Sequence, residues 1–230
     1  MRPRVPYRHV WVVIAAYNEA GAIARVISNI ASCGFSVAVV DDGSVDATDR
    51  VAQAHGAVVL RHPVNLGQGA ALQTGITYAL SCGADAIVTF DADGQHRACD
   101  IEALLAKLDG ENAEFALGSR FLGQSLRIPF TRRLLLRIAT VFTRLTTGLR
   151  LTDTHNGLRA MTRKGAAHIH LRQNRMAHAS EILSQIAQSG LRYVEVPVTI
   201  EYTAYSLAKG QRIDDSLTIL FDLLTEKLHR

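Results

Sequence analysis

Short apolar runs rich in β-branched residues alternate with amphipathic patterns over the first half of the chain. The apolar runs predict strands at Val10–Ala16, Ser36–Val40, Ala57–Leu60 and Ala84–Phe90. The segments between them have helical spacing and predict helices at Gly21–Ser32, Asp46–His55 and Gly69–Ser81. Because strands that alternate with helices form mainly parallel sheets covered on both faces, this pattern predicts an α/β fold. Ligands of such sheets bind at the carboxyl ends of the strands.

The second half of the chain continues this pattern. Periodicity predicts helices at Ala98–Leu108 and His178–Gln188, and strands at Glu114–Gly118, Leu158–Thr162 and Leu191–Ile200. A C-terminal amphipathic helix is predicted within residues 212–230. No repeat, low-complexity tract or linker divides the chain, so we predict one domain over residues 1–230 that begins with a basic tail at residues 1–9.

Composition narrows the class of protein. The chain has 230 residues, of which 48% are hydrophobic and 20% charged, as in ordinary globular proteins. Its longest apolar run, Val10–Tyr17, is much shorter than the roughly 20 residues that a membrane-spanning helix needs. The N-terminus lacks the features of a secretion signal, and the three cysteines have no metal-type or disulfide spacing. We therefore expect a cytoplasmic protein.

The positive charge is concentrated in one segment. Residues 120–150 hold seven of the 25 basic residues and no acid, which leaves 18 basic against 21 acidic residues elsewhere. Helical spacing over Thr131–Thr146 puts several of these arginines opposite an apolar face. This basic amphipathic segment predicts contact with an anionic membrane or acceptor, through Arg132, Arg133, Arg137 and Arg144. The alternative is an ordinary surface helix with solvated arginines.

Two aspartates follow the predicted strand Ala84–Phe90. Asp91 and Asp93 are separated by one residue, so both can turn into one pocket at the edge of the sheet. Neighbouring carboxylates repel unless a cation lies between them, and Mg²⁺ or Mn²⁺ prefers oxygen ligands. Gln95 can supply a third oxygen. The alternative is a solvated turn whose carboxylates cap the next helix.

Polar residues also follow the second and third strands. Asp42 lies where a strand-end carboxylate can accept hydrogen bonds from a nucleotide base or ribose. Gly67 and Gly69 open the next helix, where glycine allows close backbone approach and free N–H groups favour anions. No sequence of the P-loop type is present.

Six ordered motifs together resemble glycosyltransferase family 2, and most closely its branch of dolichol- and polyprenyl-phosphate sugar synthases. The motifs are residues 15–19, 40–48, 65–71, 91–96, 118–120 and 152–160. The resemblance implies a GT-A fold with a Rossmann-like sheet, a nucleotide-diphosphate sugar donor, and transfer with inversion at the anomeric carbon. The sequence departs from the family pattern at Ala15 and at Arg97–Ala98, where proline is usual. Neither departure removes a predicted ligand.

The resemblance also implies roles for individual residues. The donor nucleotide and sugar are expected at Ala15, Tyr17, Glu19, Asp42, Gly69 and Asp91, and the metal at Asp91, Asp93 and Gln95. Arg120 and Arg159 are expected to offset the charge that develops on the leaving nucleotide diphosphate. Asp153 is expected to orient the acceptor rather than to remove a proton, because a phosphate acceptor is already ionised near neutral pH.

Three functions remain open at this stage. The first is transfer of a sugar to a polyprenyl phosphate by an enzyme bound peripherally to the cytosolic face of a membrane. The second keeps the donor chemistry but uses a glycan or lipid-linked saccharide as acceptor. The third is a catalytically silent nucleotide-sugar binding module that acts through an integral membrane partner. No motif indicates a nucleic-acid partner.

Overall fold

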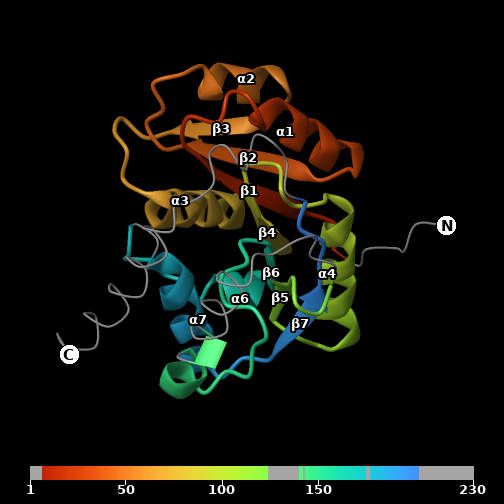
Figure 1. The fold of residues 1–230 in the computed structure, drawn as a ribbon. Coiled ribbons are helices and arrows are strands. Elements are labelled where there is room, and N and C mark those ends of the chain that lie inside the picture. Colours follow the sequence, from red (N-terminus) through yellow and green to blue (C-terminus); the bar gives the residue numbers. More distant parts are fainter. Residues whose placement is uncertain (1–6, 124–139, 142, 175–176, 202–230) are drawn as a thin grey trace.

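A seven-stranded sheet forms the centre of the computed structural model, which describes residues 7–123, 140–141, 143–174 and 177–201 (Figure 1). The strands are β1 (Val10–Ala16), β2 (Ser36–Asp41), β3 (Val58–Arg61), β4 (Ala86–Asp91), β5 (Phe115–Ser119), β6 (Arg159–Thr162) and β7 (Tyr193–Pro197). Their order in the sheet is β3-β2-β1-β4-β6-β5-β7. The helices are α1 (Ile23–Ser32), α2 (Thr48–Ala54), α3 (Gln68–Ser81), α4 (Cys99–Gly110), α6 (Arg163–Ala166) and α7 (His178–Ser189).

Most of the sheet is parallel, as the sequence predicts. β1 pairs in parallel with β2 and β4, and β2 pairs in parallel with β3. β6 runs antiparallel between β4 and β5, and β7 runs parallel to β5 at the edge. The antiparallel direction of β6 brings the segment just before it, residues 152–158, to the same end of the sheet as the carboxyl ends of β4 and β5.

Helices cover both faces of the sheet. Side chains of successive strand residues point to opposite faces, so neighbouring residues of one strand pack in different cores. Val12 and Ile14 of β1 pack in a core with apolar residues of α1 and α4. Val13, between them, belongs to a second core with residues of α3, α6 and α7. A Cβ at Gly75 of α3 would overlap Val13, so glycine permits close packing of this helix on the sheet. The predicted fold class is therefore confirmed.

Two details differ from the sequence prediction, and two predicted helices lie largely or wholly outside the described residues. β7 ends at Pro197 rather than Ile200, and Ile200 pairs instead with His96 in an isolated bridge. The short helix α6 is absent from the prediction; at four residues it is too short to have a periodicity, and the Thr162 side chain caps it. The predicted C-terminal helix and most of the predicted helix 131–146 lie outside the described residues, although residues 140–141 and 143–147 are helical.

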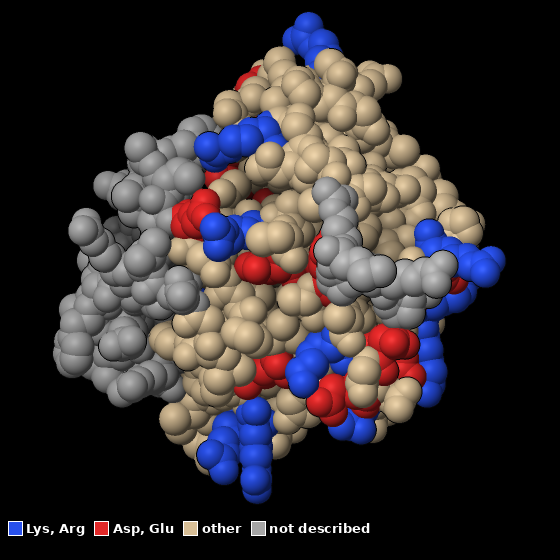
Figure 2. Space-filling model, turned by 90° about the vertical axis from the view of Figure 1, so that its right-hand side faces the viewer, with Lys and Arg blue, Asp and Glu red and all other residues tan. Residues whose placement is uncertain are grey.

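The described part of the chain contains no helix that is both long enough and apolar enough to span a bilayer. Figure 2 shows basic and acidic side chains interspersed on the face that carries α4. Lys107 and Arg192 both pair there with Glu111. Of the predicted membrane contacts, Arg132, Arg133 and Arg137 lie outside the described residues, whereas Arg144 is exposed, beside the exposed Val141 and Leu145.

Candidate functional site

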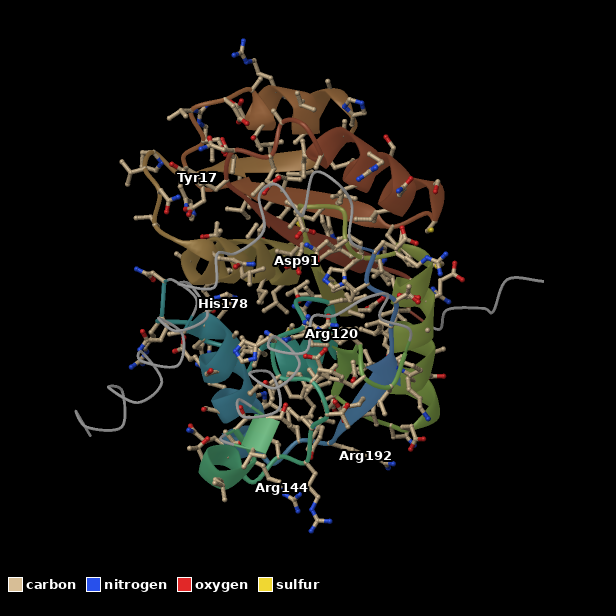
Figure 3. All side chains as sticks on the ribbon, viewed as in Figure 1. Tyr17, Asp91, Arg120, Arg144, His178 and Arg192 are labelled. Carbon is tan, nitrogen blue, oxygen red and sulfur yellow. The ribbon has the colours of Figure 1, made fainter. Side chains whose placement is uncertain are left out.

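The carboxyl ends of β1, β2 and β4 lie side by side at one edge of the sheet. The pairing places Ala16 opposite Asp41 of β2, and Ala15 opposite Asp91 of β4. Figure 3 shows Asp91 near the middle of the molecule, with Tyr17 toward the β2 and β3 end and Arg120 toward the β5 and β7 half. The structure thus brings the residues predicted for donor binding close to those predicted for catalysis.

Side chains after β2 hold the loop after β1 in place. The backbone N–H of Asn18 donates to Ser44 Oγ at 2.9 Å, and that of Glu19 donates to Thr48 Oγ1 at 2.8 Å. In return, Asn18 Oδ1 accepts from the N–H of Val45 at 2.9 Å. These bonds hold Asn18 in the left-handed backbone region, with φ of 54°. The two motifs therefore form one rigid unit, from which Tyr17 projects with 44% of its surface exposed.

Asp42 is 3% exposed, and its carboxylate organises the loop that leads into α3. Oδ1 accepts from the N–H of Leu66 at 3.0 Å and Oδ2 from the N–H of Gly67 at 2.7 Å. Nδ1 of His62 lies 2.7 Å from Oδ1, and Nε2 of the same ring lies 3.0 Å from Thr74 Oγ1. Asp42 thus shapes this end of the sheet from within, and its contact with a nucleotide stays a prediction.

Gly69 marks a close approach of two segments at the start of α3. Its N–H donates to the carbonyl of Asn174 at 3.0 Å, so this N–H is used within the chain. A Cβ at this position would overlap the carbonyl oxygen of Gln173 and lie 2.8 Å from Cβ of His178. Packing against the segment before α7 therefore explains the glycine, and its predicted role in binding the donor stays a prediction.

Asp91 lies among positive groups. His96 Nε2 is 2.8 Å from Asp91 Oδ2, and a Cβ at Gly157 would overlap both carboxylate oxygens. Burial raises the pKa of Asp91, but the hydrogen bond and charge of His96 and the charges of Arg159 and His178 outweigh it, so the pKa is below its ordinary value. The Asp91 side chain is 32% exposed, so it can reach a ligand in the site.

Asp93 has the opposite shift. Burial and the negative charge of Asp91 raise the pKa of Asp93 to about 6, with a further contribution from Glu19, although the N–H of Gln95 donates to its Oδ1 at 3.0 Å. Two carboxylates that oppose each other's ionisation form a place where a cation is stabilised.

The donor set of this acidic pair fits a magnesium or manganese ion. Asp91, Asp93 and the amide of Gln95 supply oxygen atoms only, which such ions prefer. Within the described ranges, no group of three or more His, Cys, Asp or Glu side chains could hold a metal ion. Asp91, Asp93 and Gln95 offer part of a coordination sphere, which the phosphates of a substrate would complete.

Across the site, Asp153 and Arg120 form a buried ion pair. Asp153 is 3% exposed and Arg120 is 7% exposed. Asp153 Oδ2 accepts from Arg120 Nε at 2.6 Å and from the Arg120 N–H at 3.1 Å, while the guanidinium also donates to the carbonyl of His155 at 2.8 Å. Oδ1 accepts from the N–H of His155 at 3.2 Å. Both oxygens of this carboxylate are thus used within the chain, and its expected role in orienting the acceptor stays a prediction.

Two further groups in this half of the site differ in charge: Arg159 is positive, whereas His155 is neutral. Arg159, at the start of β6, is 5% exposed, and burial lowers its pKa to about 10 even though Asp91 and Asp153 oppose the shift. Burial and the charges of Arg159 and Arg120 lower the pKa of His155 to about 4, against the effect of Asp153. His155 is therefore neutral near pH 7, and the fixed positive charge comes from the arginines.

One residue of this half was missed by sequence reasoning. Glu195 of β7 accepts hydrogen bonds from Thr152 and Asp153, the first residues of the segment that carries the ion pair. It lies 42 residues from Asp153 in the sequence, in a strand with no motif of its own. In the sequence, Glu195 differs from its neighbours only as a charged residue inside the predicted strand Leu191–Ile200.

Comparison with known proteins matches this chain to a family. The family model described as glycosyl transferase family 2 matches residues 11–169. A UDP-N-acetylglucosamine–dolichyl-phosphate N-acetylglucosaminyltransferase from Methanococcus voltae is 30% identical over 95% of this chain and 96% of its own length. A polyprenol monophosphomannose synthase from Mycolicibacterium smegmatis is 27% identical over 92% of this chain and 85% of its own length.

The fold has solved counterparts. Glucosyl-3-phosphoglycerate synthase from Mycobacterium tuberculosis, in complex with Mg²⁺ and uridine diphosphate, has a TM-score of 0.74 to this structure. The match covers 95% of this chain and 79% of that chain at 21% sequence identity. This likeness concerns the fold, and it confirms the predicted GT-A architecture.

Proposed function

Because this chain belongs to glycosyl transferase family 2, we propose that it transfers a sugar from a nucleoside-diphosphate sugar to a polyprenyl phosphate. One observation carries the proposal: at a single edge of the sheet, the acidic pair Asp91 and Asp93 faces a basic half built on Arg120 and Arg159. Such a site can hold two phosphorylated substrates at once, one through a cation and one through arginine.

The donor belongs on the side of β1, β2 and β4. We assign the nucleotide to Ala15, Tyr17, Glu19 and the loop that Asp42 organises, because these groups surround the end of the sheet beside Asp91. The exposed ring of Tyr17 is positioned for stacking on a base. A relative with 30% identity is named for a UDP-sugar, which supports a nucleotide donor without naming the sugar for this chain.

Asp91, Asp93 and Gln95 would hold Mg²⁺ or Mn²⁺ against the donor diphosphate. When bound, the ion offsets negative charge on the leaving nucleoside diphosphate. The chain itself contributes the positive charge of Arg159, which is buried and close enough to Asp91 to affect its pKa. Arg159 therefore acts where charge develops and is little screened by water there. Asp153 fixes the direction of the Arg120 guanidinium, and through it the position of the acceptor phosphate.

The acceptor belongs on the side of β5 and β7, where the basic segment 120–150 begins and ends. Dolichyl phosphate appears in the name of one relative described above, and polyprenol monophosphomannose in the name of the other. The exposed Val141, Arg144 and Leu145 combine apolar and basic surface in one helical turn, which suits the headgroup region of an anionic membrane. We therefore place the reaction at the cytosolic face of a membrane, with the chain bound peripherally.

A transfer assay tests this proposal. The full chain is incubated with Mg²⁺, each of a panel of nucleotide sugars, and a polyprenyl phosphate in detergent, while released nucleoside diphosphate is measured. We expect release with one donor, dependent on the acceptor phosphate, so the unphosphorylated polyprenol is the matched control. Release with a soluble glycan but not with the polyprenyl phosphate would instead support the glycan acceptor. Binding of a donor without any release would support a silent binding module with a membrane partner.

A further inference from the structure

Glu195 connects the edge of the sheet to the catalytic half of the site. It lies on β7, opposite Leu117 in the register with β5, and it is partly buried. We propose that Glu195 is a positioning residue that holds the Thr152–His155 segment so that the Asp153 and Arg120 pair faces the acceptor. This inference rests on the proposed function, because it assigns the acceptor step to that pair.

The contacts of Glu195 are directed at two consecutive residues. Its Oε1 accepts from the N–H of Thr152 at 2.8 Å, from Thr152 Oγ1 at 2.9 Å and from the N–H of Asp153 at 3.2 Å. Its Oε2 accepts from the same Thr152 N–H at 3.0 Å. Ser119 Oγ, at the end of β5, lies 2.6 Å from Thr152 Oγ1. Since the Thr152 hydroxyl donates to Glu195, the Ser119 hydroxyl donates to Thr152.

Through these hydrogen bonds, the position of the ion pair between Asp153 and Arg120 depends on β7. The same Asp153 whose N–H is held by Glu195 accepts from Arg120 through its carboxylate. Arg120 in turn donates to the carbonyl of His155, so it binds the Thr152–His155 segment at two points. Without Glu195, two backbone N–H groups and one hydroxyl lose their acceptor, and the segment is free to shift relative to β5. A small displacement of an orienting group can reduce the rate of a reaction by orders of magnitude.

Tyr193 provides a matched control. It lies two residues before Glu195 on the same strand, and its hydroxyl accepts from the N–H of Arg150 at 2.9 Å. It therefore anchors the same stretch of chain through Arg150, whereas the hydrogen bonds to Thr152 and Asp153 come from Glu195. If β7 only stabilised this stretch, loss of either anchor would have similar consequences. If Glu195 positions Asp153, the two consequences differ.

The experiment compares Glu195→Ala, Glu195→Gln and Tyr193→Phe in the full chain. We expect Glu195→Ala to lower kcat by about 10- to 100-fold while the affinity for nucleoside diphosphate is unchanged. Glu195→Gln should recover part of this loss, because an amide oxygen in the place of Oε1 still accepts from Thr152 and Asp153, whereas its NH₂ group cannot replace Oε2 as an acceptor for the Thr152 N–H. Tyr193→Phe should leave kcat near that of the wild type.

Amide hydrogen exchange provides a readout that does not depend on the acceptor. We expect faster exchange at Thr152 and Asp153 in Glu195→Ala, and at Arg150 alone in Tyr193→Phe. Equal kcat in Glu195→Ala and wild type, or unchanged exchange at Thr152 and Asp153, would overturn the inference. If the wild type transfers no sugar to polyprenyl phosphate while the exchange pattern appears as expected, the proposed acceptor is wrong but the positioning contact stands.

Discussion

The two halves of the site are built in different ways. On the donor side, the loops after β1 and β2 hold each other through side chains that lie within about 30 residues of one another, from Asn18 to Thr48. On the acceptor side, Arg120, Asp153 and Glu195 come from three distant parts of the chain. The donor half is thus assembled from compact local motifs, whereas the acceptor half depends on how the β5, β6 and β7 end of the sheet is put together.

The halves also differ in charge. The acidic pair Asp91 and Asp93 lies in the half that we propose for the donor. Arg120, paired with Asp153, lies in the half that we propose for the acceptor, and the buried Arg159 lies near both Asp91 and Asp153. The two halves meet at Gly157, whose backbone passes directly against the Asp91 carboxylate. A site divided in this way can hold a cation with one phosphate group in one half and a second phosphate group in the other. Changes in each half should therefore have separable effects on donor binding, transfer and stability.

The largest expected effect is on the donor side. Asp93→Asn removes one of the two carboxylates proposed to hold the cation, and we expect loss of turnover by at least about 100- to 1000-fold. The fold should remain, since the raised pKa shows that burial and the neighbouring Asp91 oppose ionisation of this group. Calorimetry measures nucleotide-sugar affinity with Mg²⁺ and with EDTA. Equal affinity in both conditions would contradict a metal held by this pair.

The second prediction concerns stability on the acceptor side. Asp153→Asn leaves the buried guanidinium of Arg120 without its counter-charge, and we expect a loss of about 3–5 kcal/mol in the free energy of unfolding. Arg120→Met combined with Asp153→Asn should recover part of that stability but none of the transfer activity. Denaturant titration gives the stability, and the transfer assay gives the activity. A stable Asp153→Asn variant would show that the pair contributes little to folding.

The third prediction returns to the donor half. Asp42→Ala removes the acceptor of the Leu66 and Gly67 N–H groups, each bonded to a charged oxygen. We expect the free energy of unfolding to fall by about 1.5–3 kcal/mol, the usual contribution of a hydrogen bond to a charged group, and nucleotide affinity to fall because the loop into α3 is no longer held. Free nucleoside diphosphate and intact donor should weaken by similar factors, because the change affects the nucleotide. Asp85→Asn, at a carboxylate near the N-terminal end of β1, is the control.

The fourth prediction is directed at the boundary between the halves. Gly157→Ala places a Cβ against both oxygens of Asp91, so the loop or the carboxylate must move. Overpacking of this kind costs about 1–3 kcal/mol in stability, and we expect donor affinity and transfer to decline together. Gly83→Ala is a useful contrast, because a Cβ there meets nothing within 4 Å and only its backbone φ of 75° is unfavourable. An unchanged donor affinity in Gly157→Ala would show that Asp91 does not contact the donor.

The smallest expected effect per residue concerns the membrane. Each arginine near an anionic surface contributes about 1 kcal/mol, so Arg144→Gln should weaken vesicle binding slightly. Changing Arg133, Arg137 and Arg144 together to Gln should release the chain from anionic vesicles while leaving nucleotide binding unchanged. Arg192→Gln, in an exposed arginine paired with Glu111, is the control. Flotation of the triple variant at low salt, with an unchanged transfer rate, would favour a soluble glycan acceptor.

Local pattern was sufficient for much of this protein. The apolar runs predicted β1 at the bounds observed, and placed the other strands within a few residues. Asp91 and Asp93 were predicted to share a pocket because carboxylates that follow a parallel strand point to one edge of the sheet, and their opposite pKa shifts agree with a shared site. Such inferences succeed because they depend on residues near one another in sequence.

The tertiary structure decided which partner each polar group binds. From the sequence alone, Asp42, Gly69 and Asp153 present groups that are equally available to a ligand. In the folded chain the Asp42 carboxylate holds the α3 loop, the Gly69 N–H donates to Asn174, and Asp153 is paired with Arg120. Hydrogen-bonding capacity is limited, and a buried donor or acceptor must find a partner wherever the chain brings one. That choice depends on contacts between distant residues, such as Glu195 with Asp153, which no local pattern encodes.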